Sequence, residues 1–358
     1  MIKKLGKGIG IVLAILVLLF IILILILTIT EFKPAEKESL EISNASEQTA
    51  DAVTLNTDYE LVSWNIGYCG LSSSADFFMD GGSHVRENSE NQVYDNLSAV
   101  NLFLSEEDPD FIFLQEVDKG SMRTYNVDES AYLAGGLSNM NTAFATNYKC
   151  LFIPYPWPPI GYIHSGIMTF SNVTLQSAER IQLPCPFSWP VRLANLKRCL
   201  MVSRVQIADS DKELILVNLH LEAYDDGEGK AKQTQMLKEL LQEEAAKGNY
   251  VIAAGDFNQT FSNVDTSAYP IIDSSYWQAG EIDVSEFDSS WQFLMDNSAP
   301  SCRSLDKAYR SADKENFQYY VIDGMILSGN IEVKEMKTLD LDFEHSDHNP
   351  INLRFSLN

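Results

Sequence analysis

An unbroken apolar run, Ile9–Ile29, is the feature that most constrains how this chain can fold. At about 1.5 Å of rise per residue, a helix over this run is roughly 30 Å long, the thickness of a bilayer's hydrocarbon core. A cleaved signal peptide is the alternative, but its apolar region is normally about 7–15 residues long and ends at a small-residue cleavage site. Because Glu31–Pro34 offers no good site, we expect an uncleaved, single-pass membrane anchor.

The flanks of the apolar run predict its orientation and the domain boundaries. Lys3, Lys4 and Lys7 precede the run, and basic residues favour the cytoplasmic side. We therefore expect a cytoplasmic tail over residues 1–8, an anchor in the cell membrane over 9–30, and an extracytoplasmic remainder. Residues 31–57 are rich in Glu, Ser, Asn, Ala and Thr and have no sustained apolar period, which predicts a disordered linker. Residues 58–358 are left for one large folded domain.

The charge of the chain limits its partners. It has 50 acidic and 26 basic residues, a net charge of -24. Such a surface repels polyanions at long range, so we expect no stable complex with nucleic acid, which needs basic patches. A phosphodiester substrate is not excluded, because a bound metal ion can invert the local field. We expect a monomer.

Strand-like and helix-like runs alternate from Tyr59 onward. Helical spacing of apolar residues predicts helices over Asn91–Ser105 and Gly229–Ala246. Strands rich in Val, Ile, Leu and aromatic residues are expected at Glu60–Ile66, Phe111–Val117, Ile163–Phe170, Cys199–Ile207, Leu214–Leu221, Tyr250–Ala254, Tyr319–Leu327, Ile331–Leu339 and Ile351–Phe355. Two units read strand, helix, strand. This order predicts an α/β domain in which two mixed β-sheets pack face to face with helices outside, a four-layer sandwich.

Several of these apolar runs end abruptly in polar residues. They end in Trp64-Asn65, Gln115-Glu116, Asn218-Leu219-His220, Gly255-Asp256-Phe257-Asn258 and Ile322-Asp323, and the loop Ser346-Asp347-His348 precedes the last strand. One acidic residue at a strand end is usually a turn residue or a helix cap. Six such endings in one domain are harder to explain by capping, because buried carboxylates need a cation or a proton.

This ordered set of motifs resembles the endonuclease/exonuclease/phosphatase superfamily, and within it the deoxyribonuclease and neutral sphingomyelinase branch. The resemblance covers residues 60–355, nearly the whole external domain. It implies a metal-dependent phosphoesterase. His220 favours that branch because the abasic-site endonuclease branch lacks a histidine there. The chain departs from the pattern at Gly67, where some nucleases carry an acidic residue.

The resemblance implies a metal site of oxygen ligands. Glu116 would be the primary ligand of Mg²⁺ or Mn²⁺, since hard cations take carboxylate oxygens. Asn65 and Asp347 would complete the metal environment.

The resemblance also implies the catalytic groups. His348 would act as general base, with Asp323 fixing its tautomer and raising its basicity. Asp256 would orient or activate the attacking water, or carry a second metal. Asn258 would donate a hydrogen bond to the phosphoryl oxygen as charge builds there. His220 would bind the phosphate or protonate the leaving group.

Other residues have less specific signals. Arg86 follows the Asn65 strand, in a loop that can line the substrate pocket. Arg192 and Arg198 belong to a basic cluster that could clamp a phosphate, although solvated surface is the commoner fate of such charges. The stiff loop Pro154–Pro159 could touch lipid or a base, or only connect two strands.

The sequence therefore predicts a membrane-anchored hydrolase of phosphodiesters. Nucleic acid, a phospholipid headgroup and a small phosphate ester all remain open as substrates. The alternatives are a phosphomonoesterase on the same scaffold and a non-catalytic surface module that binds a partner.

Overall fold

The computed structural model describes residues 2–45, 49–225, 227–309, 314–315 and 317–358. Its helices are α1 (Ile2–Ile29), α2 (Glu90–Glu107), α3 (Glu129–Gly136) and α4 (Glu228–Ala246). Short 3-10 turns lie at η1 (Gly67–Cys69), η2 (Phe78–Asp80), η3 (Met122–Thr124), η4 (Val191–Ala194) and η5 (Val284–Glu286).

Two seven-stranded mixed sheets form the body of the domain. Sheet A has, in order across it, β1 (Lys37–Ser39), β7 (Leu175–Gln182), β8 (Cys199–Gln206), β9 (Glu213–His220), β10 (Tyr250–Asp256), β16 (Asp323–Leu327) and β13 (Gln292–Leu294). Sheet B has β17 (Ile331–Thr338), β18 (Ile351–Leu357), β3 (Asp58–Asn65), β4 (Phe111–Asp118), β6 (Gly161–Ser171), β5 (Asn141–Ile153) and β2 (Ile42–Ser43). Two-stranded pairs join β11 (Gln259–Phe261) to β12 (Gly280–Ile282), and β14 (Cys302–Arg303) to β15 (Tyr319–Tyr320).

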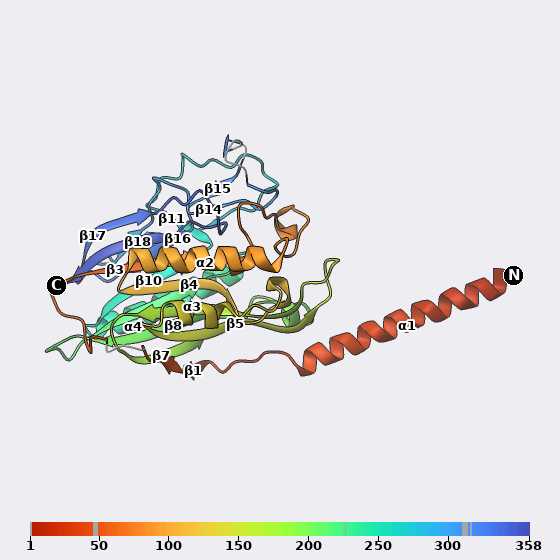
Figure 1. Ribbon diagram of the computed structural model, residues 1–358, viewed down its shortest axis with the longest axis horizontal. Coiled ribbons are helices and arrows are strands. Elements are labelled where there is room, and N and C mark those ends of the chain that lie inside the picture. Colours follow the sequence, from red (N-terminus) through yellow and green to blue (C-terminus); the bar gives the residue numbers. More distant parts are fainter. Residues whose placement is uncertain (1, 46–48, 226, 310–313, 316) are drawn as a thin grey trace.

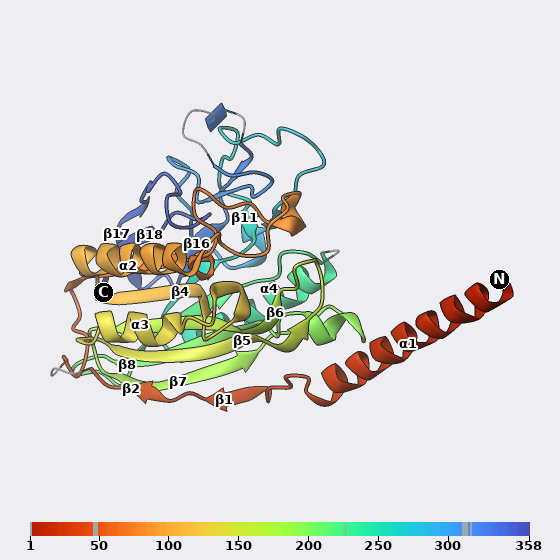
Figure 2. The same cartoon turned by 45° about the vertical axis from the view of Figure 1, so that its right-hand side comes forward.

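The two sheets pack face to face with helices on their outer faces, as the sequence predicted (Figures 1 and 2). Between the sheets, Phe113 of β4 packs in one apolar cluster with Ile252 of β10. On the outer face of sheet B, Leu97 of α2 joins Trp64 in a second cluster. On the outer face of sheet A, Leu237 of α4 belongs to a third. Helices α2 and α4 therefore each bury the apolar stripe that the sequence period indicated.

Both strand–helix–strand units contain a parallel strand pair. β3 pairs in parallel with β4 across the α2 connection, and β9 with β10 across the α4 connection. The carboxyl ends of each pair therefore point the same way, and side chains that follow these strands collect at one edge of their sheet.

Helix α1 projects from the sandwich (Figure 1). Its segment Gly6–Ile29 is long and apolar enough to cross a membrane. Its last turns contact the domain, since Leu27 is buried beside Cys150 and Ile153 at the end of β5.

Two expectations about the chain path were wrong. Residues 31–57 were expected to be a disordered linker, yet β1 pairs with β7 and β2 pairs with β5. The outermost strands of a sheet present unpaired backbone N–H and C=O groups, which pair with an extended segment whatever its side chains. The expected strand Tyr319–Leu327 is split, because Tyr319–Tyr320 pairs with β14 and β16 begins only at Asp323. The helix α3 and the strands β5 and β7 were not predicted.

Candidate active site

Three of the sequence-selected residues are neighbours across sheet A. His220 at the end of β9, Asp256 at the end of β10 and Asp323 at the start of β16 lie opposite one another in register. Asp323 begins its strand because β16 runs antiparallel to β10. The start of an antiparallel strand lies at the same edge as the ends of parallel ones, so the topology brings these side chains together.

Sheet B contributes the second half of the site. Asn65, the last residue of β3, pairs with Gln115 of β4, and Glu116 follows within a register shift between Leu114 and Val117. Glu116 has a φ of 55°, in the left-handed region that non-glycine residues rarely adopt. This bulge directs Glu116 out of the strand's alternation, a device often found beside active sites.

The loop before β18 connects the two halves. The backbone carbonyl of His348 accepts a hydrogen bond from Trp64 Nε1 at 2.8 Å. The hydroxyl of Ser346 donates to the carbonyl of Asn65 at 2.8 Å. These bonds hold Asp347 and His348 against the end of β3.

His348 is held by a buried carboxylate. Its Nδ1 lies 2.8 Å from Asp323 Oδ2, and its Nε2 lies 3.9 Å from Asp256 Oδ2. Burial disfavours the charged imidazole, but the Asp323 carboxylate outweighs this effect and holds the pKa of His348 above its ordinary value. The pair therefore has the geometry of an oriented general base, with Nε2 facing Asp256.

Asp256 lies at the centre of the polar groups. Its Oδ2 accepts from Asn65 Nδ2 at 3.0 Å and lies 3.3 Å from His220 Nε2. Its Oδ1 accepts from the backbone N–H of Asn258 at 2.8 Å. Burial raises the pKa of Asp256 to about 7, with His348 opposing the shift and Asp323 adding to it.

The amide of Asn65 connects two carboxylates. Its Nδ2 donates to Glu116 Oε1 at 3.2 Å as well as to Asp256, and its Oδ1 accepts from the N–H of Gly67 at 3.0 Å. In this arrangement Asn65 positions the carboxylates. Its oxygen, the atom expected to face a metal, accepts from the backbone instead.

Gly67 allows the close approach of Asp347. A Cβ at position 67 would lie 2.8 Å from Asp347 Oδ1, and Gly67 has a φ of +52°. The acidic side chain that some nucleases carry at this position would have no room here, so the departure noted in the sequence has a steric reason.

The residues fit a hard divalent cation. Glu116 and Asp347 face the same cavity as Asp256. Burial raises the pKa of Asp347 to about 6, with His348 opposing the shift and Glu116 adding to it. Carboxylates that crowd and desolvate one another are stabilised by a cation, and oxygen ligands suit Mg²⁺ or Mn²⁺.

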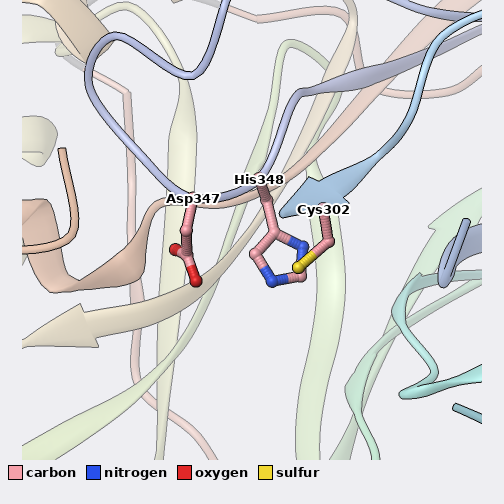
Figure 3. Close-up of side chains that lie close together, drawn as sticks. All are labelled: Cys302, Asp347 and His348. Carbon is pink, nitrogen blue, oxygen red and sulfur yellow. The ribbon is translucent and has the colours of Figure 1, made fainter. Parts of the chain in front are cut away.

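A cysteine that the sequence analysis did not select also lies in the site. Ligand atoms of Cys302, Asp347 and His348 lie within 4.8 Å of one another, and Figure 3 shows the thiol beside the imidazole. Burial raises the pKa of Cys302 to about 12, so the thiol keeps its proton at neutral pH. Hard cations such as Mg²⁺ and Mn²⁺ take oxygen ligands in preference to sulfur, which leaves the carboxylates as the candidate ligands.

His220 and Asn258 complete the predicted catalytic set. Burial, together with the charges of Arg198 and His348, lowers the pKa of His220, so its imidazole is neutral. Its buried Nδ1 has no hydrogen-bond partner among the described residues. Asn258 also lines the cavity, but its Nδ2 donates to the carbonyl of Leu221 at 2.9 Å.

The three predicted phosphate-binding arginines lie in different places. Arg198 lines the cavity, but its Nε lies 3.3 Å from Glu222. Arg192 pairs with Glu31 at 3.1 Å, outside the cavity lining. Arg86 lies over the ring of Tyr125, also outside that lining.

Four further charged residues line the cavity: Asp80, Arg123, Glu222 and Arg303. Arg123 is buried and donates to both oxygens of Asp118, at 3.0 and 2.8 Å. Asp80 lies in the loop that follows β3, and burial together with the nearby Asp347 raises its pKa to about 7. The sequence analysis placed the loop of Arg86, which also contains Asp80, near the pocket. It did not single out Arg123.

All the predicted catalytic and metal residues except Asn65 and Asp323 are among those lining one cavity of about 730 Å³. The two exceptions lie directly behind it, hydrogen-bonded to Asp256 and His348.

Comparison with known proteins places this geometry in context. The model of the Endonuclease/Exonuclease/phosphatase family matches residues 62–323. No curated protein sequence matches the chain.

Among solved structures, an endonuclease/exonuclease/phosphatase protein from Beutenbergia cavernae DSM 12333 is 16% identical, with a TM-score of 0.56 over 84% of this chain and 72% of that one. D. rerio TDP2 complexed with a single-strand DNA product is 16% identical, with a TM-score of 0.51 over 84% and 100%. The human nocturnin catalytic domain with bound sulfate is 14% identical, with a TM-score of 0.51 over 89% and 97%. At these identities the likeness shows a shared fold.

Proposed function

The chain belongs to the endonuclease/exonuclease/phosphatase family, and from this premise we propose that it is a metal-dependent phosphodiesterase anchored in the cell membrane, with its catalytic domain outside the cytoplasm. The observation that carries the proposal is the convergence of His348, Asp256 and Glu116, from three separate elements, on one cavity. Nothing in the packing of a purely structural domain requires these buried polar groups to meet.

The protein's own groups supply positioning and proton transfer. Asp323 holds Nδ1 of His348, so that Nε2 can take a proton from water at the Asp256 side of the cavity. Asp256 accepts from two amides, which fix its carboxylate to orient that water. His220 Nε2 lies 3.3 Å from the same oxygen, Oδ2 of Asp256, where it can contact the phosphoryl group or the leaving oxygen.

Glu116 and Asp347 would hold the metal ion, with Asn65 orienting Glu116. A bound Mg²⁺ or Mn²⁺ would neutralise charge on the non-bridging phosphoryl oxygens.

Two of the three arginines that line the cavity are already neutralised by carboxylates, which favours a phosphodiester over a phosphomonoester. Arg123 pairs with Asp118 and Arg198 pairs with Glu222, whereas Arg303 donates to backbone carbonyls such as that of Ser72 at 2.7 Å and has no carboxylate partner among the described residues. A phosphomonoester dianion carries an extra charge that usually requires an unpaired cation. A phosphodiester carries a single negative charge and therefore needs less positive charge around it.

A pair of soluble esters tests the reaction. The full chain, in detergent with Mg²⁺ or Mn²⁺ at several pH values, should hydrolyse bis-p-nitrophenyl phosphate faster than p-nitrophenyl phosphate. The opposite preference would favour the phosphomonoesterase. Turnover of neither ester, nor of DNA, RNA, sphingomyelin or inositol phosphates, would favour a binding module.

The anchor and its orientation rest on α1 and on the three lysines that precede its apolar part. Protease treatment of intact cells should remove a tag fused to the C-terminus. Protection of that tag would overturn the extracytoplasmic placement.

A further inference from the structure

The cavity of the proposed active site has one wall made by the membrane anchor. Four residues of α1 line the cavity that also contains His348 and Asp256, at the helical spacing of one face: Phe20, Leu23, Ile24 and Leu27. A helix long and apolar enough to span a bilayer thus presents one stripe of its surface to the catalytic cavity.

Specific contacts hold α1 against the domain. Leu27 is 5% exposed and packs with Cys150, Ile153 and Leu193. Directly after it, Trp189 Nε1 donates to Thr28 Oγ1 at 3.1 Å. The anchor and the catalytic domain therefore meet through packed side chains at this point.

Charge contacts extend the junction beyond the end of α1. Glu31 is buried, with Arg192 Nε at 3.1 Å and Lys197 Nζ at 3.5 Å from its Oε1. A free tether would allow the catalytic domain to tumble above the membrane, and this junction prevents that.

The depth of these contacts follows from helix geometry. Phe20 precedes the helix end at Ile29 by nine residues, or roughly 14 Å at the α-helical rise of about 1.5 Å per residue. When α1 spans a bilayer, this stretch lies in the outer half of the hydrocarbon core. The loops packed against it must therefore enter the outer leaflet.

These loops carry the side chains that such a position requires. Tyr155 is 70% exposed and Trp157 is 89% exposed, both in the loop between β5 and β6. Trp189 and Val191, beside the end of α1, are also more than half exposed. In Figures 1 and 2 the loop between β5 and β6 lies at the end of the sandwich from which α1 projects. Tyrosine and tryptophan favour the membrane interface, where an apolar ring and a polar edge are both accommodated.

The cavity continues this apolar surface inward. Tyr148, Ile160 and Leu193 pack in one apolar cluster with the α1 wall, and they line the same cavity as the polar residues of the site. An amphiphile can therefore place its phosphate ester at His348 and its apolar chain along α1. A soluble polyanion lacks such a chain and meets a protein with a net charge of -24.

We propose that Tyr155, Trp157, Trp189 and Val191 form a rim that inserts into the outer leaflet, and that the substrate is the phosphate ester of a lipid in the same bilayer as α1. This inference rests on the proposed phosphodiesterase function and names its substrate class.

Fluorescence quenching tests the insertion of the rim. The full chain is reconstituted in phosphatidylcholine vesicles with and without brominated acyl chains, which quench tryptophans close to them. Trp157→Phe and Trp189→Phe should each remove part of the quenching, whereas Trp291→Phe, in the core of the domain, should not. Equal quenching in wild type and all three variants would overturn the inserted rim.

Lipid turnover tests the substrate class. Vesicles containing sphingomyelin, phosphatidylcholine or phosphatidylinositol are incubated with the full chain and Mg²⁺. At least one of these lipids should be hydrolysed. Trp157→Asp and, independently, Trp189→Asp should reduce that rate about tenfold or more, because a charged side chain is unfavourable in the hydrocarbon of the outer leaflet. Leu102→Asp, at an exposed apolar position of α2, is the matched control and should leave the rate unchanged.

The results separate the two proposals. If the wild type hydrolyses bis-p-nitrophenyl phosphate but none of the embedded lipids, or prefers DNA, the lipid inference fails and the phosphodiesterase stands. If it hydrolyses neither the soluble ester nor any lipid, the proposed function itself fails. An equal loss of rate in Leu102→Asp would show that the rim variants act through something other than insertion, and would overturn the inference.

Discussion

His348 Nδ1 and Asp323 Oδ2 lie 2.8 Å apart although 25 residues separate them in the chain. β16 carries Asp323 to the edge of sheet A, and the loop before β18 carries His348 there from sheet B. The hydrogen bond thus joins the two sheets at the catalytic cavity.

We expect His348→Ala to reduce kcat for bis-p-nitrophenyl phosphate by ~10²–10⁴, the usual contribution of a general base. Asp323→Asn should also reduce kcat, because it retains the shape but loses the charge that orients the imidazole and raises its pKa. The measurement is steady-state kinetics, with thermal unfolding to verify the fold. A rate unchanged in His348→Ala would remove this residue from the mechanism.

Glu116→Gln should weaken metal binding. It exchanges a carboxylate for a neutral amide at the candidate ligand while keeping the hydrogen-bonding shape beside Asn65. We expect at least a roughly tenfold rise in the Mg²⁺ concentration for half-maximal turnover, since hard cations prefer carboxylate oxygen. Titration calorimetry with Mn²⁺ gives a second measure. Glu107→Gln, at the exposed end of α2, is the control. Equal Mn²⁺ affinity in the two variants would contradict the ligand assignment.

Gly67→Ala should disturb Asp347. The new Cβ would lie 2.8 Å from Asp347 Oδ1, so the carboxylate must move, and we expect weaker Mg²⁺ activation with overpacking of about 1–3 kcal/mol. Gly120→Ala separates this clash from backbone strain. Gly120 also has a positive φ, +81°, but a Cβ added there would lie 3.9 Å from its nearest neighbour, the carbonyl oxygen of Asn126. If both variants lose stability equally and neither changes the Mg²⁺ dependence, the contact with Asp347 has no role in the site.

The sequence predicted those site residues that follow recognisable strands. His220 and Asp256 end apolar runs joined by a helical period, and the rule that parallel strands end at one edge then brings them together. The same rule does not apply to Arg123 or Cys302. These residues come from a short turn and a two-residue strand, and tertiary packing alone puts them in the cavity.

Residues 31–57, which follow α1, show a second limit of prediction from the sequence. The composition of residues 31–57 indicated disorder, but composition describes side chains, and β1 and β2 are held by backbone hydrogen bonds to the ends of existing sheets. Likewise, the sequence of the loop Pro154–Pro159 did not decide whether this loop contacts lipid, contacts a base or only connects two strands. Only the position of α1 beside it favours one of these.

Glu244 provides a pH-dependent test of stability away from the cavity. Burial raises its pKa, but hydrogen bonds from Arg204, Lys247 and Asn249 outweigh burial and lower the pKa to about 2. The unfolded chain has a glutamate pKa of about 4.3. Because the folded-state pKa is the lower of the two, the stabilisation is complete above about pH 5 and is lost as the pH falls toward 2.

Glu244→Gln should therefore destabilise the domain at pH 7 by on the order of 1–3 kcal/mol, and by roughly half as much near pH 3. Thermal unfolding of the full chain in detergent from pH 3 to 7 measures this difference. Glu243→Gln is the neighbouring control, because that side chain is 69% exposed and pairs only at the surface with Lys247. A deficit in Glu244→Gln that stays constant from pH 7 to 3 would show that packing, and not the ionised carboxylate, stabilises this junction between α4 and β8.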